Sequence, residues 1–262
     1  MLDLLPNRPE IMLLMFIRVS AILFLLPLFG DQGLPSMLKI GMSLMVTLLL
    51  YPVIPVTTVT MSNSLMGFFL TALLEVLVGL ALGFTSQLIF YGIQMSGQVI
   101  GIQMGFGIVN VIDPMTELEV SVISRLQYLF GFYLFLIIGG HHYFLMAVGE
   151  SFKLVPIGSF RFSGTLVNQF ITMTGHVFSL AIRLGAPCMV ALLMTDVALG
   201  FIARVAPQMN VFIVGFPLKI AMGLIMLALS LPMFAAVFSG IFDRFVRDLL
   251  QLLALMGGAG GP

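Results

Sequence analysis

The sequence contains very little charge. Only 8% of its 262 residues are Asp, Glu, Lys or Arg, whereas soluble domains carry about a quarter. Hydrophobic residues make up 60% of the chain, and its mean hydropathy is +1.16. Such a chain has too few polar groups to cover a globule in water. We therefore predict an integral membrane protein, or a subunit whose apolar faces are covered by partners.

Other absences exclude several classes of site. The single cysteine, Cys188, rules out an internal disulfide framework and a cysteine-cluster metal site. Eleven basic residues balance eleven acidic ones, which argues against a nucleic-acid partner because nucleic acid needs a basic surface. Gly105–Gly107 lacks the Lys-Ser/Thr ending of a phosphate-binding loop, and the three histidines show no ligand spacing. We expect no enzyme, no metal and no cofactor.

The first residues lack the pattern of a cleaved signal peptide, and the last residues are rich in glycine. Asp3 and Glu10 flank Arg8, so no cationic region precedes the first apolar run. We therefore expect that run to persist and not to be cleaved as a signal peptide. Residues 1–256 are expected to form one membrane domain, followed by a flexible glycine-rich tail at 257–262.

Long hydrophobic runs dominate the rest of the sequence. About 20 apolar residues suffice to cross a bilayer as a helix, and some of these runs are far longer. No alternating strand pattern is present, so the predicted fold is all-α, with long, bent helices and helical hairpins. The six regions are Ile11–Phe29, Ile40–Val56, Leu65 to about Val111, Ile123–Gly139 continuing to Val148, Leu166–Ile202 and Val211–Phe242.

Ionisable residues lie within or beside these runs, where an unpaired charge is costly. They could form a charged pathway or proton relay. They could instead form pairs that fix packing between helices or subunits, which the near-equal numbers of acids and bases favour. Asp196 and Arg204 lie on one predicted helix face with Gly200 between them. The residues considered are Arg18, Glu75, Arg183, Asp196, Arg204 and Lys219.

Glycines and glutamines share one face of the helix predicted from Leu65. At 100° per residue, six of them fall within an arc of about 60°. Small residues at this spacing let two helix backbones approach closely. The face could mediate ordinary packing within the chain, or it could face other subunits around a shared axis. The six residues are Gly83, Gln87, Gln94, Gln98, Gly101 and Gly105.

An apolar loop flanked by glycine follows this face. Gly105 and Gly107 allow backbone conformations that other residues rarely adopt. Pro114 disfavours the helical conformation at Asp113. A hydrophobic constriction needs such a loop, but so does a re-entrant turn buried in the interior. Composition leaves both open. The loop comprises Phe106, Gly107, Ile108, Val109, Asn110, Val111 and Ile112.

One block of the sequence, Leu199–Leu218, has a specific pattern. It resembles the FliR/SctT family of type III export-gate membrane subunits, and the resemblance continues in Gly101–Gly105, Asp113–Pro114 and Leu154–Gly158. It covers nearly the whole chain. The residues that carry the most specific part are Arg204, Pro207, Gly215, Phe216 and Pro217.

The resemblance implies a non-enzymatic core subunit of the flagellar export apparatus, in the bacterial inner membrane at the flagellar basal body. Such a subunit would assemble with FliP and FliQ, near FlhB and FlhA-type proteins, into a helical hetero-oligomer in contact with lipid. Unfolded flagellar proteins would pass through its channel, and the loop Phe106–Ile112 would be the plug that closes the resting pore.

Three alternatives stay open. The chain could be a stand-alone secondary transporter that couples ions through Glu75, Asp196 or Arg183. It could be an SctT homologue of a virulence secretion system. It could also be a structural membrane subunit that supports an enzyme complex.

Overall fold

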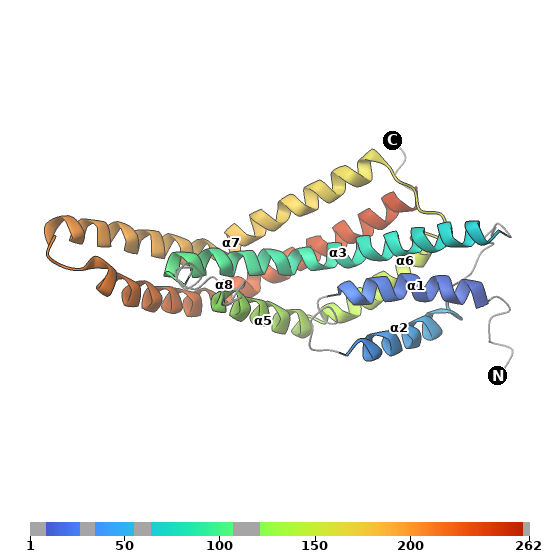
Figure 1. The fold of residues 1–262 in the computed structure, drawn as a ribbon, viewed down its shortest axis with the longest axis horizontal. Helices are drawn as coiled ribbons and strands as arrows, with labels where there is room; N and C mark the ends of the chain where they lie inside the picture. Colours follow the sequence, from blue (N-terminus) through green and yellow to red (C-terminus); the bar gives the residue numbers. More distant parts are fainter. Residues whose placement is uncertain (1–8, 27–34, 55–63, 107–120, 259–262) are drawn as a thin grey trace. The chain divides into compact units, whose positions relative to one another are not determined.

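A computed structural model describes residues 9–26, 35–54, 64–106 and 121–258. Every regular element in these ranges is a helix (Figure 1), which confirms the all-α prediction. The helices are α1 (Pro9–Leu25), α2 (Ser36–Leu50), α3 (Leu65–Met104), α5 (Val122–Ile137), α6 (Gly140–Leu154), α7 (Gly164–Val205) and α8 (Val211–Met256).

The helices follow the six predicted hydrophobic regions, although their ends differ, α8 continues past Phe242 to Met256, and one region is divided. The region that starts at Ile123 forms two helices, because the chain leaves the α-helical conformation at Ile138 and Gly139. Gly139 has φ = +71° and precedes the first turn of α6, a left-handed conformation that glycine adopts without steric cost. The break therefore has a local cause in the sequence.

Within the described ranges, three helices are long and apolar enough to cross a membrane: α3, α7 and α8, which have 40, 42 and 46 residues. The α5–α6 pair would add a fourth crossing if it counts as one broken span. The chain is therefore an all-helical membrane protein. Each of the three long helices has about twice the residues that a crossing needs.

The chain divides into two compact units. Unit 1 contains residues 1–88, 139–174 and 244–262, and unit 2 contains residues 89–138 and 175–243. The boundaries fall inside α3, α7 and α8 and at the break between α5 and α6. These units describe packing within the chain, and the expectation of a single domain over 1–256 stays a prediction.

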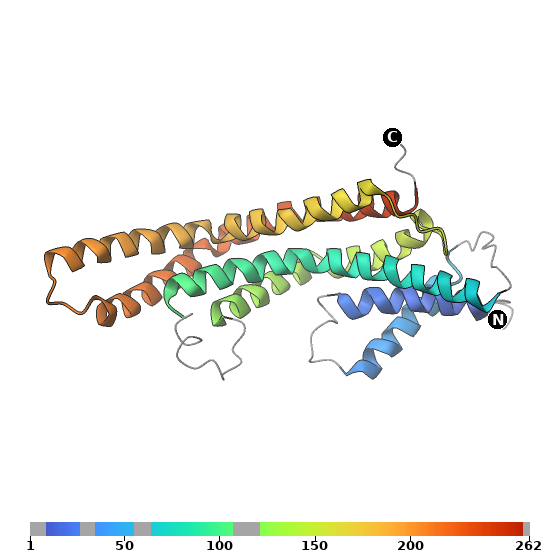
Figure 2. The ribbon, with the colours of Figure 1, turned by 45° about the horizontal axis from the view of Figure 1, so that its top comes forward.

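In unit 1, α1 packs against α2 and against the first half of α3 (Figures 1 and 2). Two glycines of α3 make the second contact close. A Cβ atom at Gly79 or at Gly83 would lie 2.5 Å from the Cβ of Ala21 or of Leu25, respectively, on α1. The two helix backbones can approach this closely only because both α3 positions lack a side chain.

Helix α2 presents an unusual surface. Its buried residues are the polar Ser43 and Thr47, whose hydroxyls donate to the carbonyls of Lys39 and Ser43 at 2.7 Å. Its large apolar side chains point outward, and Met37 is 87% exposed. A protein in water would arrange these residues the other way round. This outer face must therefore be covered by lipid or by another protein.

Unit 2 has an apolar core that joins α3, α5, α7 and α8. Its fully buried members include Ile100, Met104, Cys188 and Leu192. The second half of α7 and the first half of α8 lie side by side as a helical hairpin (Figure 2). The turn at 206–210 joins them, and Pro187, Pro217 and Pro232 all lie inside these continuous helices.

Candidate functional site

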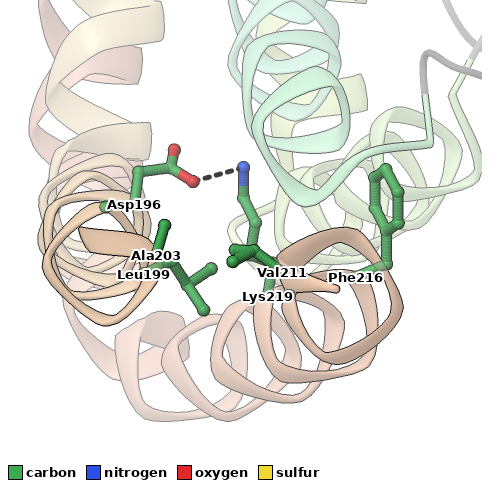
Figure 3. Close-up of a pocket in the computed structure, with 8 residues that line it drawn as sticks. Asp196, Leu199, Ala203, Val211, Phe216 and Lys219 are labelled. Atoms are coloured by element: carbon green, nitrogen blue, oxygen red, sulfur yellow. Dashed lines mark ion pairs between the residues drawn. The ribbon is translucent and has the colours of Figure 1, made fainter. Parts of the chain in front are cut away.

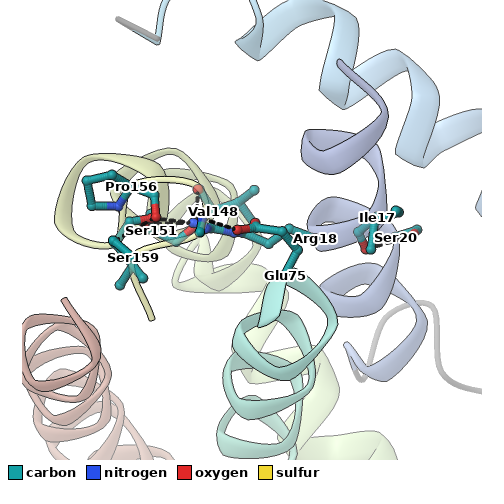
Figure 4. A network of polar contacts seen from close by, with 10 residues as sticks. Ile17, Arg18, Ser20, Glu75, Val148, Ser151, Pro156 and Ser159 are labelled. Carbon is teal, nitrogen blue, oxygen red and sulfur yellow. Dashed lines mark hydrogen bonds and ion pairs between the residues drawn. The ribbon is translucent and has the colours of Figure 1, made fainter. Parts of the chain in front are cut away.

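The most deeply buried charges of the described chain form a polar network in unit 1 (Figure 4). Arg18 on α1 and Glu75 on α3 are 0% and 1% exposed, and Arg18 Nε donates to Glu75 Oε2 at 2.6 Å. Arg18 Nη1 also donates to the backbone carbonyls of Ser151 and Val155, at 2.9 and 2.8 Å. The Phe152 ring lies 4.4 Å from the guanidinium carbon. Arg18 thus holds the C-terminal end of α6.

Glu75 completes the network on its other side. Its Oε1 accepts a hydrogen bond from the backbone N–H of Gly158 at 2.9 Å. Gly158 lies in the turn after α6 with φ = +76°, and the Ser159 N–H bonds to the Pro156 carbonyl across this turn. A buried ion pair is tolerable when the remaining donors and acceptors are also satisfied. Here the backbone at the end of α6 and in the following turn satisfies Arg18 Nη1 and Glu75 Oε1, whereas the buried Arg18 Nη2 has no hydrogen-bond partner among the described residues.

The family-like block lies at the α7–α8 hairpin of unit 2. Arg204 belongs to the last turn of α7, Pro207 to the connecting turn, and Gly215, Phe216 and Pro217 to the first part of α8. A Cβ atom at Gly215 would lie 3.2 Å from a Leu199 methyl group, so glycine lets α8 approach α7 closely here.

A pocket of about 260 Å³ opens between the second half of α7 and the first half of α8 (Figure 3). Asp196 from α7 and Lys219 from α8 meet at this pocket, with 2.6 Å between Lys219 Nζ and Asp196 Oδ1. The Asp196 side chain is 45% exposed and the Lys219 side chain is 18% exposed. The rest of the lining is apolar or glycine: Leu199, Gly200, Ala203, Val211, Gly215 and Phe216. The pocket therefore combines an apolar surface with one balanced pair of charges.

The other predicted charges lie differently. Arg183 and Arg204 are exposed on α7, and Asp196 is also exposed although it is paired. Only Arg18 and Glu75 are buried by the chain itself. Burial of Arg183, Asp196 and Arg204 would require neighbouring subunits and stays a prediction.

The face of α3 that carries the predicted glycines and glutamines is called the α3 stripe, and its glycines mediate contacts within the chain. Gly83 packs against α1 in unit 1. In unit 2, a Cβ atom at Gly101 would collide with the Ser121 side chain, and one at Gly97, at the edge of the stripe, would collide with the backbone of Ser124. Gly105 ends the stripe with φ = +98°, and a Cβ atom there would lie 2.7 Å from the Phe216 ring.

The glutamines of the stripe are half-buried. The side-chain Oε1 of Gln98 accepts a hydrogen bond from the Ser121 N–H at 3.0 Å. The backbone carbonyl of Gln94 accepts one from the Ser124 hydroxyl at 2.8 Å. Both contacts attach the start of α5 to α3. Gln87 is also half-buried, in unit 1. Whether the remaining surface of this stripe faces a pore stays a prediction.

The predicted plug loop lies almost wholly outside the described residues. Of its seven members, only Phe106 is described, and it packs against the core cluster of unit 2. Its N–H bonds to the Gly101 carbonyl at the end of α3. Gly107, Ile108, Val109, Asn110, Val111 and Ile112 lie outside the described ranges.

The sequence singled out Arg18, Glu75, Asp196 and Lys219 but did not show which of them pair or which backbone groups they contact. The Arg18–Glu75 pair spans 57 positions, and the carbonyl acceptors of Arg18 lie 133 and 137 positions away. A usable signal was present: the Pro156-Ile157-Gly158 turn ends a helix inside an apolar region, where its polar backbone needs partners.

Comparison with known proteins gives a consistent result. Residues 10–245 match the family described as "Bacterial export proteins, family 1". The chain is 33% identical to the "Flagellar biosynthetic protein FliR" of Bacillus subtilis, with 94% of this chain and 95% of the relative covered. It is 30% identical to the proteins of the same name from Escherichia coli and Aquifex aeolicus, covering 92% of both chains for the first and 90% and 91% for the second.

The match extends over both units and includes the Arg18–Glu75 network of unit 1 and the α7–α8 hairpin of unit 2. It agrees with the resemblance found in the Leu199–Leu218 block and with the membrane-type helices of the structure. The chain therefore belongs to the bacterial export proteins of family 1, as an all-helical membrane component of flagellar protein export.

Proposed function

We propose that this chain assembles with FliP and FliQ into a gated channel through which unfolded flagellar proteins leave the cell. The channel would lie in the bacterial inner membrane at the flagellar basal body, next to FlhB and FlhA-type proteins. The chain would act as a structural subunit that shapes and seals the path, and not as a catalyst. The family match and the Leu199–Leu218 block support this proposal.

The observation that carries the proposal is apolar surface in excess of what lipid can cover. In the most apolar 18-residue windows of α3, α7 and α8, only 22%, 33% and 17% of the residues are buried by the chain. A bilayer covers about 20 residues of a helix, and these helices have 40 or more. The remaining apolar surface needs protein neighbours, which a hetero-oligomer would provide.

Exposed charges on α7 also support contact with partner subunits. Arg183, Asp196 and Arg204 lie on the exposed surface of an apolar helix. Each would cost a few kcal/mol against hydrocarbon. Contact with a neighbouring subunit, or with water in a conduit, avoids that cost. The part of α7 from Arg183 to Arg204, which carries these three charges, is therefore the part of the chain that we expect to meet partners.

The test is purification from flagellated cells through an affinity tag on this chain, in a mild detergent. We expect FliP and FliQ to co-purify in one particle, whose mass is then measured by native mass spectrometry. A membrane protein of similar size carrying the same tag is the control for nonspecific recovery. The proposal would be contradicted if this chain purified as a stable monomer and that monomer restored motility to cells that lack the chain.

Reconstitution separates this function from the transporter alternative. The purified single chain is placed in lipid vesicles, and ion-coupled solute uptake is measured. We expect no uptake without partners. Uptake by the chain alone, abolished by a neutral substitution at Glu75 or Asp196, would favour a secondary transporter over an export channel.

A further inference from the structure

We propose that Arg18 and Glu75 form a directional clamp for the connection between α6 and α7, residues 155–163, and not an exchangeable ion pair. The two sides of the clamp contact backbone groups of opposite polarity. Arg18 meets carbonyl acceptors, whereas Glu75 meets an N–H donor. The order of the two charges, cation on α1 and anion on α3, is therefore set by the backbone that they hold (Figure 4).

The Arg18 side must carry a donor. Its Nη1 contacts the carbonyls of Ser151 and Val155, at the end of α6. The Ser151 carbonyl also accepts the Val155 N–H at 2.9 Å. The last carbonyls of a helix carry partial negative charge, so they favour a cation. A carboxylate at this position would face two carbonyl oxygens and a helix end of its own sign.

The Glu75 side must carry an acceptor. Its Oε1 receives the Gly158 N–H at 2.9 Å, in a turn that depends on the positive φ of this glycine. A guanidinium group at position 75 has donors only and could not accept this N–H. Exchanging the two charges thus preserves their mutual attraction but removes all three backbone contacts.

The clamp also fixes a second segment. The Arg161 N–H in the held connection bonds to the Met256 carbonyl at the end of α8, at 3.0 Å. All four described segments, from α1, α3, the α6–α7 connection and the end of α8, belong to unit 1. Loss of the clamp should therefore loosen residues 155–163 first, together with their contact to α8.

The main experiment is limited trypsin digestion of the full chain in its detergent-solubilised assembly. Arg161 is exposed and lies inside the clamped connection, so cleavage after it measures how often the connection opens. Cleavage after the exposed Arg125 on α5, in unit 2 and outside the α7–α8 hairpin, serves as the internal reference. The variants are R18M, which removes the clamp, and the charge-exchanged R18E/E75R. E150Q, which breaks an exposed pair with Lys153, is the control.

We expect R18M and R18E/E75R to raise cleavage at Arg161, relative to Arg125, by at least about tenfold, because each leaves buried polar groups without partners. E150Q should leave the ratio unchanged. Restoration of the wild-type ratio in R18E/E75R would show that only the charge pair matters and would overturn the proposal. An unchanged ratio in R18M would overturn it as well.

Hydrogen exchange on the unmodified protein gives a second test that does not depend on the folding of a variant. Gly158 lies in an exposed turn, where a free amide exchanges quickly. Because its N–H is bonded to the buried Glu75, we expect exchange at least about tenfold slower than for the free peptide. Exchange of this amide at the rate of the free peptide would contradict the clamp.

Discussion

Asp196 and Lys219 form an ion pair of 2.6 Å that links the two arms of the α7–α8 hairpin. The pair stands at a pocket whose other lining residues are apolar or glycine. Because Asp196 is nearly half exposed, its contribution to the stability of the single chain should be at most about 1 kcal/mol. Its larger effect is expected where a neighbouring subunit covers the hairpin and removes water from the pair.

Asp196→Asn is therefore predicted to impair assembly more than it changes the dependence of export on the proton gradient. Asp196→Glu keeps the charge and is the matched control. Assembly is measured as the yield of the complex after detergent extraction and gel filtration, and export as secreted flagellar protein at graded proton-motive force. A normal yield with an altered proton dependence would instead favour a proton relay at Asp196.

Deletion of Val109–Val111 is predicted to let ions leak through the assembled complex. Burial of each apolar side chain stabilises a closed constriction by about 1.5–3 kcal/mol, so loss of the two apolar side chains Val109 and Val111, together with a shorter loop, should leave it open. Conductance is measured across planar bilayers that contain the purified assembly. Val109→Leu, which retains an apolar side chain, is the control. Unchanged conductance of a normally assembled deletion variant would contradict the plug hypothesis.

Gly79→Ala is predicted to destabilise the chain by about 1–3 kcal/mol, because overpacking a close helix contact forces the backbones apart. The new methyl group would lie 2.5 Å from the Ala21 Cβ and 2.8 Å from the Arg18 carbonyl oxygen. Gly240→Ala is the matched control in α8, since no atom lies within 4 Å of its Cβ position. There, alanine should be neutral or stabilise the helix by up to about 1 kcal/mol.

Thermal unfolding in detergent, followed by circular dichroism, checks this pair of variants. The midpoint should fall for Gly79→Ala and should hold or rise for Gly240→Ala. Equal midpoints for the two variants would show that α1 and α3 do not pack as closely at Gly79 as the structure has it.

Cys188 is predicted to resist thiol-reactive reagents in the folded protein. Its side chain is 0% exposed and belongs to the core cluster of unit 2, next to Leu192 and Leu227. A maleimide should label it only after denaturation, which makes it a reporter of unfolding in this unit. Thr165→Cys adds an exposed thiol at the start of α7 as a positive control. Equal labelling rates of the two thiols in the native protein would contradict the described core.

The positions of the helices could be predicted from the sequence because hydropathy and helix breaking are local properties. The Leu65–Met104 helix lies in a continuous apolar run, and α8 continues to Met256, beyond the predicted end at Phe242. The split between α5 and α6 was not predicted, although Gly139-Gly140 is its visible cause. The family-like block was also readable, since its motif is contiguous.

Tertiary structure alone decided which partners meet. Arg18 lies 57 positions from Glu75 and 133 from the Ser151 carbonyl, and no local pattern encodes such pairings. The sequence placed Asp196 and Arg204 on one helix face, yet Asp196 pairs with Lys219 on the next helix. Likewise, composition identified the glycines of α3 as contact residues, but only the packed fold shows that α1 and α5 are what they contact. Composition and periodicity determine what each helix face can bury, whereas the choice of neighbour depends on how all the helices pack at once.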